Sequence, residues 1–481
     1  MGLYSIGSMS FLSVVLTLAP TANAMTQKSD AMGGKTPRIE VGVDARVELL
    51  SIVFRIAGAE EYQRGRVPAY SADVDSYFGP FAEHRAVRRV VELRQRYRIS
   101  HDAVVKLAVH VDDATTLSES VSLTDTGTLG SRWQPEIARA FLEDLRVFAN
   151  DTDFARFIDQ HQELYRTTEA RLEKQIESDQ LAWLDEYFGE ASRSLQIIPG
   201  MLTGRASYGA TVVRDSGKDR YAIVGVETVD GSGVPEFDGA VVEAIVHELC
   251  HSYLRPILED YSDDLRDAGV ALYLSERSKM ESQAYRSGST VMNETLTRAC
   301  THRYLKAKVG AEAVEGDLIY NRSRGFVWIA DVSRLLEIYE ANRVQYSTFA
   351  DFAPELTKFF ANYTSDLPDS ADKEQAGRPH VVKVVPANGA TDVDPALEAI
   401  EVTFDRPMRA DAWSVVGGGP KYPDTDTPAY DPARRVFRLP VKLEPNRDYE
   451  LWLNRGQYES FASAEGVPLA PFRVAFRTRS R

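Results

Sequence analysis

The stretch AIVHELCHSYLRP, Ala244–Pro256, places two histidines and a glutamate in an otherwise apolar segment. His247 and His251 are four residues apart, so on a helix both imidazoles project from one face and can reach a single ion. Glu248 lies about 100° further round the helix, where it can accept a proton from a metal-activated water. A structural role for three polar groups in a core helix would require partners for all of them. The pattern therefore predicts a metal-binding catalytic helix.

A third metal ligand must come from elsewhere in the chain, because catalytic zinc usually has three protein ligands and one open position. The residues after His251 read SYLRP, so no third histidine follows at the metzincin spacing. The segment VMNETLTRACTHRYL, residues 291–305, supplies Glu294, 43 positions after His251. Two competing carboxylates lie in a more polar segment, Glu276 and Glu281. The expected cofactor is Zn²⁺ held by the two histidines and Glu294.

The spacing of these motifs resembles that of zinc peptidases of the gluzincin clan, which pair HExxH with a downstream N-E-x-x-x-D or similar helix. Here Asn293 and Glu294 match, while Arg298 stands at the clan's acidic position, so no carboxylate that would orient a ligating histidine is found. From roughly Val47 to Tyr363 the chain more closely resembles an uncharacterised family of zinc metallopeptidases known as a domain of unknown function. The matching stretches are VELLSIVFRIAG, SYGATV, HELCHSYLRP, MNETLTRA and RGFVWIADV. The resemblance implies a gluzincin-like fold and chemistry and names no substrate.

The candidate catalytic residues follow from this arrangement. Glu248 is the expected general base, which would pass its proton to the leaving amine. A second electrophile would stabilise the oxyanion, and Arg298 and His302 follow Glu294 on the same side of a helix. A salt bridge to Glu294 is the structural alternative for Arg298. Other candidates for the electrophile are Tyr285, Tyr304 and Arg324.

A predicted hairpin precedes the metal helix, with strands at residues 205–213 and 221–229. In the gluzincin clan an edge strand at this point commonly binds the substrate main chain by strand addition. The resemblance therefore implies contacts with a peptide or protein substrate near Tyr208 and Gly209. The alternative is an ordinary core strand.

The expected fold class is α+β. Helical periodicity dominates a zincin-like metallohydrolase domain at residues 38–365, with a small antiparallel sheet and a metal helix that Pro256 ends. A turn-rich linker follows at 366–379, and short alternating segments at 380–481 predict an antiparallel β-sandwich. The stretch VVPANGATDVDP closely resembles bacterial Ig-like domains, which implies a spacer, a stabiliser, or a module that contacts carbohydrate or the cell surface.

The N-terminus predicts export to the periplasm or the extracellular space. The apolar run FLSVVLTLAP followed by TANA is typical of a secretory signal at residues 1–24, although no Lys or Arg precedes it, and 25–37 reads as a flexible leader. A short buried helix is the alternative. The net charge of −15 argues against a generic surface for nucleic acid. No later stretch is long and apolar enough to span a membrane.

Two further questions stay open at this level. Cys250 and Cys300 could form one disulfide between the ligand-bearing helices, or remain two buried thiols. The leading hypothesis is an exported zinc hydrolase of the peptidase type. The alternative is a non-catalytic binding protein on a metallopeptidase-like scaffold, although such a scaffold would not need Glu248.

Overall fold

The computed structural model describes residues 37–481 apart from 125, 131, 366, 368–376, 411, 457, 465 and 481. The expected signal peptide, residues 1–24, and the leader before Pro37 lie outside the described residues, as does most of the expected linker. The described chain is helical with a small sheet before the linker and rich in strands after it. The mixed α+β class with a strand-rich C-terminal region is therefore confirmed.

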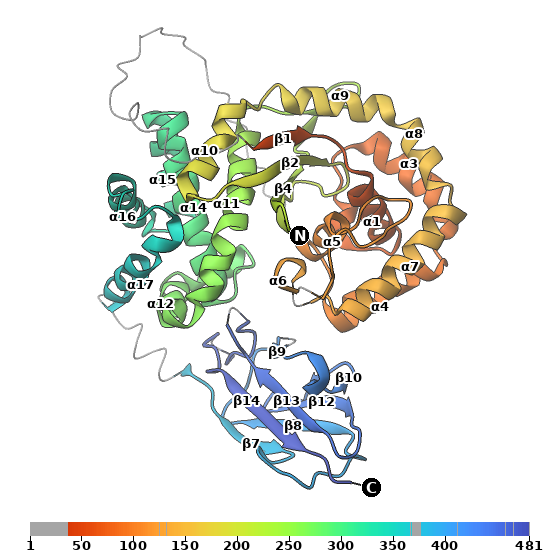
Figure 1. Ribbon diagram of the computed structural model, residues 1–481, viewed down its shortest axis with the longest axis vertical. Coiled ribbons are helices and arrows are strands. Elements are labelled where there is room, and N and C mark those ends of the chain that lie inside the picture. The colour runs from red at the N-terminus through yellow and green to blue at the C-terminus, as the bar shows by residue number, and fades with distance from the viewer. Residues whose placement is uncertain are drawn as a thin grey trace. The chain divides into compact units, whose positions relative to one another are not determined.

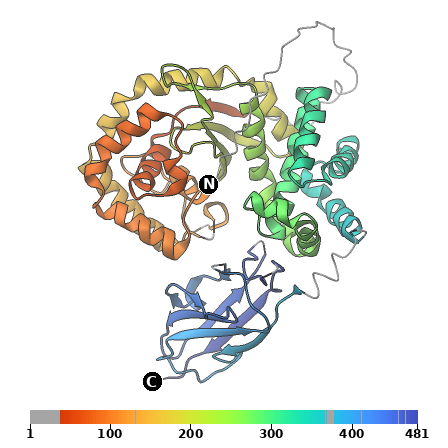
Figure 2. The same cartoon turned by 180° about the vertical axis from the view of Figure 1, so that it is seen from behind.

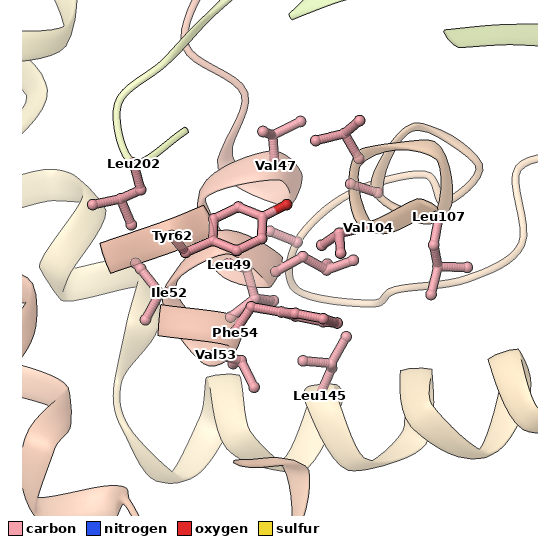
Figure 3. Packing of buried hydrophobic residues seen from close by; sticks show 14 of the residues in the cluster. Val47, Leu49, Ile52, Val53, Phe54, Tyr62, Val104, Leu107, Leu145 and Leu202 are labelled. Carbon is pink, nitrogen blue, oxygen red and sulfur yellow. The ribbon is translucent and has the colours of Figure 1, made fainter. Parts of the chain in front are cut away.

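The first lobe of the helical region is built around helix α1 (Figures 1 and 2). Its elements are α1 (Ala45–Ile56), α2 (Glu60–Gln63), α3 (Pro68–Phe78), the 3₁₀ turn η1 (Gly79–Phe81), α4 (Arg85–Tyr97), α5 (Asp102–Val109), α6 (Thr126–Leu129), α7 (Pro135–Asp151), α8 (Phe154–Gln160) and α9 (Gln162–Glu173). Helix α1 is buried over most of its circumference, which is typical of a helix enclosed by others. Figure 3 shows its side chains packed among those of the helices that surround it: Leu49, Val53 and Phe54 against Val104, Leu107 and Leu145.

A carboxyl group lies inside this apolar core. Glu48 of α1 is 0% exposed and accepts hydrogen bonds from Tyr70 Oη (2.7 Å) and from the backbone N–H of Met201 (3.3 Å). Burial raises the pKa of Glu48 to about 7, although both hydrogen bonds oppose the shift. The folded state therefore resists ionisation of Glu48 more strongly than the unfolded state does.

We expect Glu48→Gln to remove a pH dependence of stability. The stability that neutral Glu48 contributes is fully present below pH 4.5 and is lost as the pH rises through about 7, a loss of about 3 kcal/mol. Urea unfolding of the wild type and the variant at pH 5 and pH 8 would measure it. The wild type should lose more stability between the two pH values than Glu48→Gln. Equal losses would contradict this assignment.

The sheet between the two lobes has the order β1-β2-β4-β3, with strands β1 (Arg38–Val41), β2 (Ser192–Gly200), β4 (Gly217–Gly225) and β3 (Tyr208–Arg214). The expectation of an antiparallel sheet is wrong for most of it, because β1, β2 and β4 run parallel. The helices between β1 and β2 provide the long crossover that parallel pairing needs. The predicted hairpin is present: β3 pairs antiparallel with β4, and it lies at the edge of the sheet. A separate two-stranded ribbon follows, β5 (Thr228–Val229) with β6 (Pro235–Glu236).

The second lobe is built around helices α11 and α14. Its elements are α10 (Ser178–Phe188), α11 (Ala240–Asp260), α12 (Ser262–Ser275), α13 (Arg277–Ser282), α14 (Gly288–Lys308), α15 (Ala311–Ser323), α16 (Ile329–Ala341) and α17 (Phe349–Ser365). The prediction that Pro256 ends the metal helix is wrong, since α11 continues to Asp260. Pro256 is exposed, and the next two residues, Ile257 and Leu258, pack against the core and hold the helix across the missing N–H.

The C-terminal region forms two antiparallel sheets around one apolar core. One sheet has the order β10-β12-β8-β7 with β11 beside β12, and the other has the order β14-β13-β9. The bounds are β7 (Val381–Val385), β8 (Ala399–Phe404), β9 (Val415–Val416), the 3₁₀ turn η2 (Gly419–Lys421), β10 (Asp424–Thr425), β11 (Ala429–Tyr430), β12 (Val436–Lys442), β13 (Asp448–Leu453) and β14 (Phe472–Arg477). Val402 and Phe437 of the first sheet and Leu451 and Val474 of the second are buried in the core. This arrangement agrees with the predicted β-sandwich.

Candidate metal centre

Helices α11 and α14 bring three side chains together. His247 Nε2 lies 3.2 Å from His251 Nε2, and the Glu294 carboxylate lies 3.8 Å from the first and 3.5 Å from the second. Within the described residues these three form the group of His, Cys, Asp and Glu side chains that could hold a metal ion. The structure thus places the three predicted ligands at one point, although they come from segments more than forty residues apart.

The spacing of the three ligand atoms fits zinc. Zinc–nitrogen and zinc–oxygen bonds are about 2.0–2.2 Å long, so two ligands of a tetrahedral ion lie about 3.3–3.6 Å apart. The observed separations of 3.2, 3.5 and 3.8 Å scatter around that value. Three protein ligands would leave the fourth tetrahedral position of a zinc ion open, as in catalytic zinc sites.

The charges at the group suit a divalent cation. Burial, reinforced by the neighbouring His251, lowers the pKa of His247 to about 3, so its imidazole is neutral and keeps a lone pair for a metal. Burial raises the pKa of Glu294, but the hydrogen bond and charge of His251 outweigh it and hold the pKa well below its usual range. Burial lowers the pKa of His251, but the hydrogen bond and charge of Glu294 outweigh burial and raise this pKa above its usual value. His247 and Glu294 are thus already in the forms that bind zinc, whereas His251 has to release a proton to bind it.

The orienting partner of His251 is Asn293, which sequence reasoning did not identify. His251 Nδ1 lies 2.7 Å from Asn293 Oδ1 and 3.0 Å from Thr297 Oγ1. A proton on Nδ1 that is donated to the amide oxygen directs Nε2 toward Glu294. The sequence analysis expected a carboxylate in this role. An amide oxygen can accept the same hydrogen bond, so Asn293 takes the place of the carboxylate. The signal was present in the sequence, one residue before Glu294.

Arg298 and Tyr285 hold the Glu294 carboxylate. Arg298 Nη2 lies 3.3 Å from Glu294 Oε2 and donates to Tyr285 Oη (3.2 Å), and Tyr285 Oη donates to Glu294 Oε2 (3.1 Å). The salt bridge that was the structural alternative for Arg298 is therefore present. Tyr285 lies in the break between α13 and α14. Ser287 marks the start of α14 after this break, since its side chain caps the helix by accepting from the N–H of Thr290 (3.1 Å).

His302 does not join this group. It is 3% exposed, and its Nδ1 lies 2.7 Å from Asp317 Oδ2 of α15. It is not among the residues that line the cavity at the metal group. The structure therefore assigns His302 to the contact between α14 and α15 and not to the reacting centre.

The competing carboxylates are engaged elsewhere. Glu276 pairs with Lys279 (3.1 Å), and Glu281 accepts hydrogen bonds from Tyr273 (2.7 Å) and Arg277 (3.0 Å).

The two cysteines are free and buried, so the disulfide alternative is not realised and the two-thiol alternative holds. Burial raises the pKa of the Cys250 thiol and that of Cys300, so both remain protonated.

Glu248 lies beside the metal group and against strand β3. Burial raises the pKa of Glu248 to about 7, the charge of His251 opposes the shift, and a backbone hydrogen bond from Gly209 opposes it further. A carboxylate with such a pKa can both accept and release a proton near neutral pH. Glu248 is not one of the three converging side chains, and its role as a base stays a prediction.

A cavity of about 780 Å³ opens onto these groups. It is lined by α5 of the first lobe, by α11 and α14 of the second, and by the edge strand β3 between them. Tyr208 and Gly209, the predicted substrate contacts, line it together with Ala210 and Thr211. Residues of an edge strand thus line the same cavity as the metal group.

Gly209 also sets the distance between β3 and α11. A Cβ atom at residue 209 would overlap the backbone carbonyl oxygen of Glu248. We therefore expect Gly209→Ala to displace β3 from α11 and to destabilise the protein by about 1–3 kcal/mol. Thermal unfolding measures this loss. Ala210→Gly, the reverse change at the next position, is the control and should cost only about 1 kcal/mol. Unchanged stability of Gly209→Ala would show that the close approach is not rigid.

None of the helices in the described part of the chain combines the length and the apolar character that crossing a membrane requires.

No curated protein matches the chain. The solved structures that are similar in part include two of an S-layer protein. The match to the crystal structure of the S-layer protein rSbsC(31-844) has 13% sequence identity and covers 49% of this chain and 33% of the S-layer chain. The match to the structure of the surface layer protein SbsC, domains 1–6, has 12% sequence identity and covers 53% of this chain and 35% of that chain. The chain spans about a third of the length of these structures, and TM-scores of 0.16 support no inference about fold or function.

Two families match the sequence directly. Residues 375–478 match the bacterial Ig-like domain, in agreement with the β-sandwich and with the resemblance noted in its opening strands. Residues 39–359, which include nearly all of both lobes and the three converging side chains, match the domain of unknown function DUF4932. The chain therefore belongs to the DUF4932 family and carries a bacterial Ig-like domain after it.

Proposed function

We propose that the DUF4932 region is a zinc-dependent peptidase with a gluzincin-like fold and site. The observation that carries the proposal is the convergence of His247, His251 and Glu294 beside Glu248, in a cavity whose wall is an edge strand. Two imidazoles and one carboxylate are a donor set of catalytic zinc sites, and the separations of the ligand atoms fit the ion. The bacterial Ig-like domain supports an extracellular or surface location for the activity.

The residues of the chain divide the chemistry among them. Bound zinc would supply a Lewis acid that makes water more acidic and polarises a carbonyl group. Glu248 would take a proton from the attacking water onto its carboxylate and deliver it to the departing amine. Arg298 would act through Glu294, whose orientation it fixes, and is a positioning residue. Tyr285, which lines the cavity, is a better candidate than His302 for stabilising the oxyanion, and to do so it would turn its hydroxyl proton from Glu294 toward the oxyanion.

Strand β3 would hold the substrate. The outer edge of β3 is not paired within the described sheet. Residues of this strand between Tyr208 and Val213 line the cavity. A peptide that adds to this edge gains main-chain hydrogen bonds whatever its sequence. Its scissile carbonyl can then lie close to Glu248, because Gly209 packs directly against that residue. This supports a peptide substrate over a small hydrolysable ester.

Cleavage of a mixed peptide library by the zinc-loaded full chain tests the proposal, with products identified by mass spectrometry. Cleavage that a chelator abolishes and stoichiometric zinc restores would support it. Stoichiometric zinc with no cleaved peptide would overturn the peptidase assignment. Such a result would favour hydrolysis of another bond, or a non-catalytic binding protein on the same scaffold.

A further inference from the structure

The cavity continues past the metal group to two cations that the proposed mechanism does not use. Arg255 of α11 and Lys106 of α5 both line the cavity, one from each lobe. Arg255 follows His251 by four residues, so it lies about 6 Å further along the helix axis on nearly the same face. The two cations therefore border the space next to the reacting centre.

Strand β3 runs along α11 toward these cations. Gly209 packs against Glu248, and Ser252 Oγ donates to the carbonyl of Ala210 (3.4 Å), so successive residues of β3 lie beside successive turns of α11. Thr211 and Val213, further along β3, also line the cavity. An added peptide strand advances about 3.3 Å per residue, so it covers the distance from His251 to Arg255 in about two residues.

Lys106 and Arg255 each pair with a carboxylate that also lines the cavity, Asp102 and Glu259. Lys106 is 8% exposed at its side chain and contacts Asp102 Oδ2 at 2.6 Å, and Arg132 pairs with the same carboxylate. Arg255, 29% exposed, pairs with Glu259 at 3.2 Å. Three cations thus share two carboxylates, and one of the three, Arg132, does not line the cavity.

Lys106 and Arg255 are also close enough to repel each other. Burial lowers the pKa of Lys106 to about 8, Asp102 opposes this shift, and the charge of Arg255 adds to it. A buried ammonium with a second cation near it is stabilised by a further anion. Each of the two side chains has more N–H donors than its carboxylate partner uses, and these donors suit a carboxylate.

We propose that Lys106 and Arg255 form a cationic subsite that receives a carboxylate of the peptide substrate about two residues from the scissile bond. The inference rests on the proposed function and adds a substrate class to it. The carboxylate can come from an Asp or Glu side chain or from the C-terminus of the peptide. Both sources present the same chemistry to the subsite, and they differ in whether the cut is internal or close to the end of the peptide.

Binding measured without turnover tests the subsite. Fluorescence anisotropy on zinc-loaded Glu248→Gln protein would compare three sets of labelled decapeptides on an alanine–glutamine background. Each peptide of the first set carries one Glu, placed at a different position in each peptide, and an amidated C-terminus. The second set is neutral with a free C-terminus. The third set is neutral with an amidated C-terminus. We expect one of the first two sets to bind at least about 10-fold more tightly than the third, since hydrogen bonds between charged groups reach this strength.

Substitutions on the same background identify the residues responsible. Adding Arg255→Gln should remove the preference and leave the binding of the neutral amidated peptides unchanged, and Arg255→Glu should shift the preference to Lys-containing peptides. Lys106→Gln should also weaken the preference, and thermal unfolding shows whether that buried change leaves the protein folded. The control is Arg334→Gln, a cation on α16 that does not line the cavity, which should change nothing.

Wild-type kcat/KM for the same peptides separates this inference from the proposed function. Cleavage of all three sets at equal rates, with equal binding, would overturn the subsite and leave the peptidase standing. Binding of acidic peptides that depends on Arg255, without any cleavage, would support the subsite and overturn the peptidase. A preference that survives in both Arg255 variants would also overturn the subsite.

Discussion

Replacing Glu248 with glutamine is expected to lower kcat/KM for peptide cleavage by about 100- to 10 000-fold, the usual contribution of a general acid–base residue. Glutamine keeps the shape of the side chain and the contact with Gly209, but it cannot accept and return a proton. Zinc content should stay the same, because Glu248 is not one of the converging ligands. Parallel measurement of cleavage rate and zinc stoichiometry checks both parts.

The control for this variant lies on the same helix. Glu243 precedes His247 by one turn of α11 and does not line the cavity. Glu243→Gln should therefore retain full activity. Full activity in Glu248→Gln would exclude it as the base, whereas loss of zinc together with activity would show that it acts on the metal group and not on a proton.

Replacing Glu294 with glutamine is expected to weaken zinc binding by more than about 100-fold, since even outer partners of metal ligands commonly contribute 10- to 100-fold. The change removes the negative charge that faces both imidazoles and also leaves Arg298 without its anionic partner. Competition with a zinc chelator of known affinity measures the loss, and cleavage should fall in parallel at limiting zinc.

Glu276→Gln provides the matched comparison. Glu276 was a competing ligand in the sequence, but the structure pairs it with Lys279. Its substitution should leave zinc affinity unchanged. Reversed results, with zinc lost from the Glu276 variant and kept in the Glu294 variant, would mean that the ion is held by a different set of side chains.

The metal helix could be predicted because its information is local. His247 and His251 share a helix face by their spacing alone, and the apolar flanks indicate burial. Glu294 was reached less directly, through the need for a third ligand and a resemblance to a known clan. The structure then brought it within 4 Å of both histidines.

The errors have local physical causes too. Pro256 does not end its helix, because packing on both sides of a proline outweighs one lost hydrogen bond. The sheet is mostly parallel, because strand direction depends on crossovers that periodicity does not reveal. His302 shares a helix with Glu294, yet it pairs with Asp317 on the next helix, and only tertiary packing decides that choice.

Other site residues carried no recognisable signal in the sequence. Lys106 lies more than a hundred residues before the metal helix, in an amphipathic segment like many others. Its place in the cavity depends on how the first lobe packs against β3. Asn293 belongs to the motif that matches the gluzincin clan, but its hydrogen bond to His251 depends on how α14 packs against α11.

Crystals of the zinc-loaded full chain, with anomalous diffraction recorded on both sides of the zinc absorption edge, test the central claim most directly. The account predicts one strong anomalous peak about 2.0–2.2 Å from His247 Nε2, His251 Nε2 and a Glu294 oxygen, with a fourth position free of protein ligands. A peak held by other side chains, or one at this group without Glu294, would contradict it.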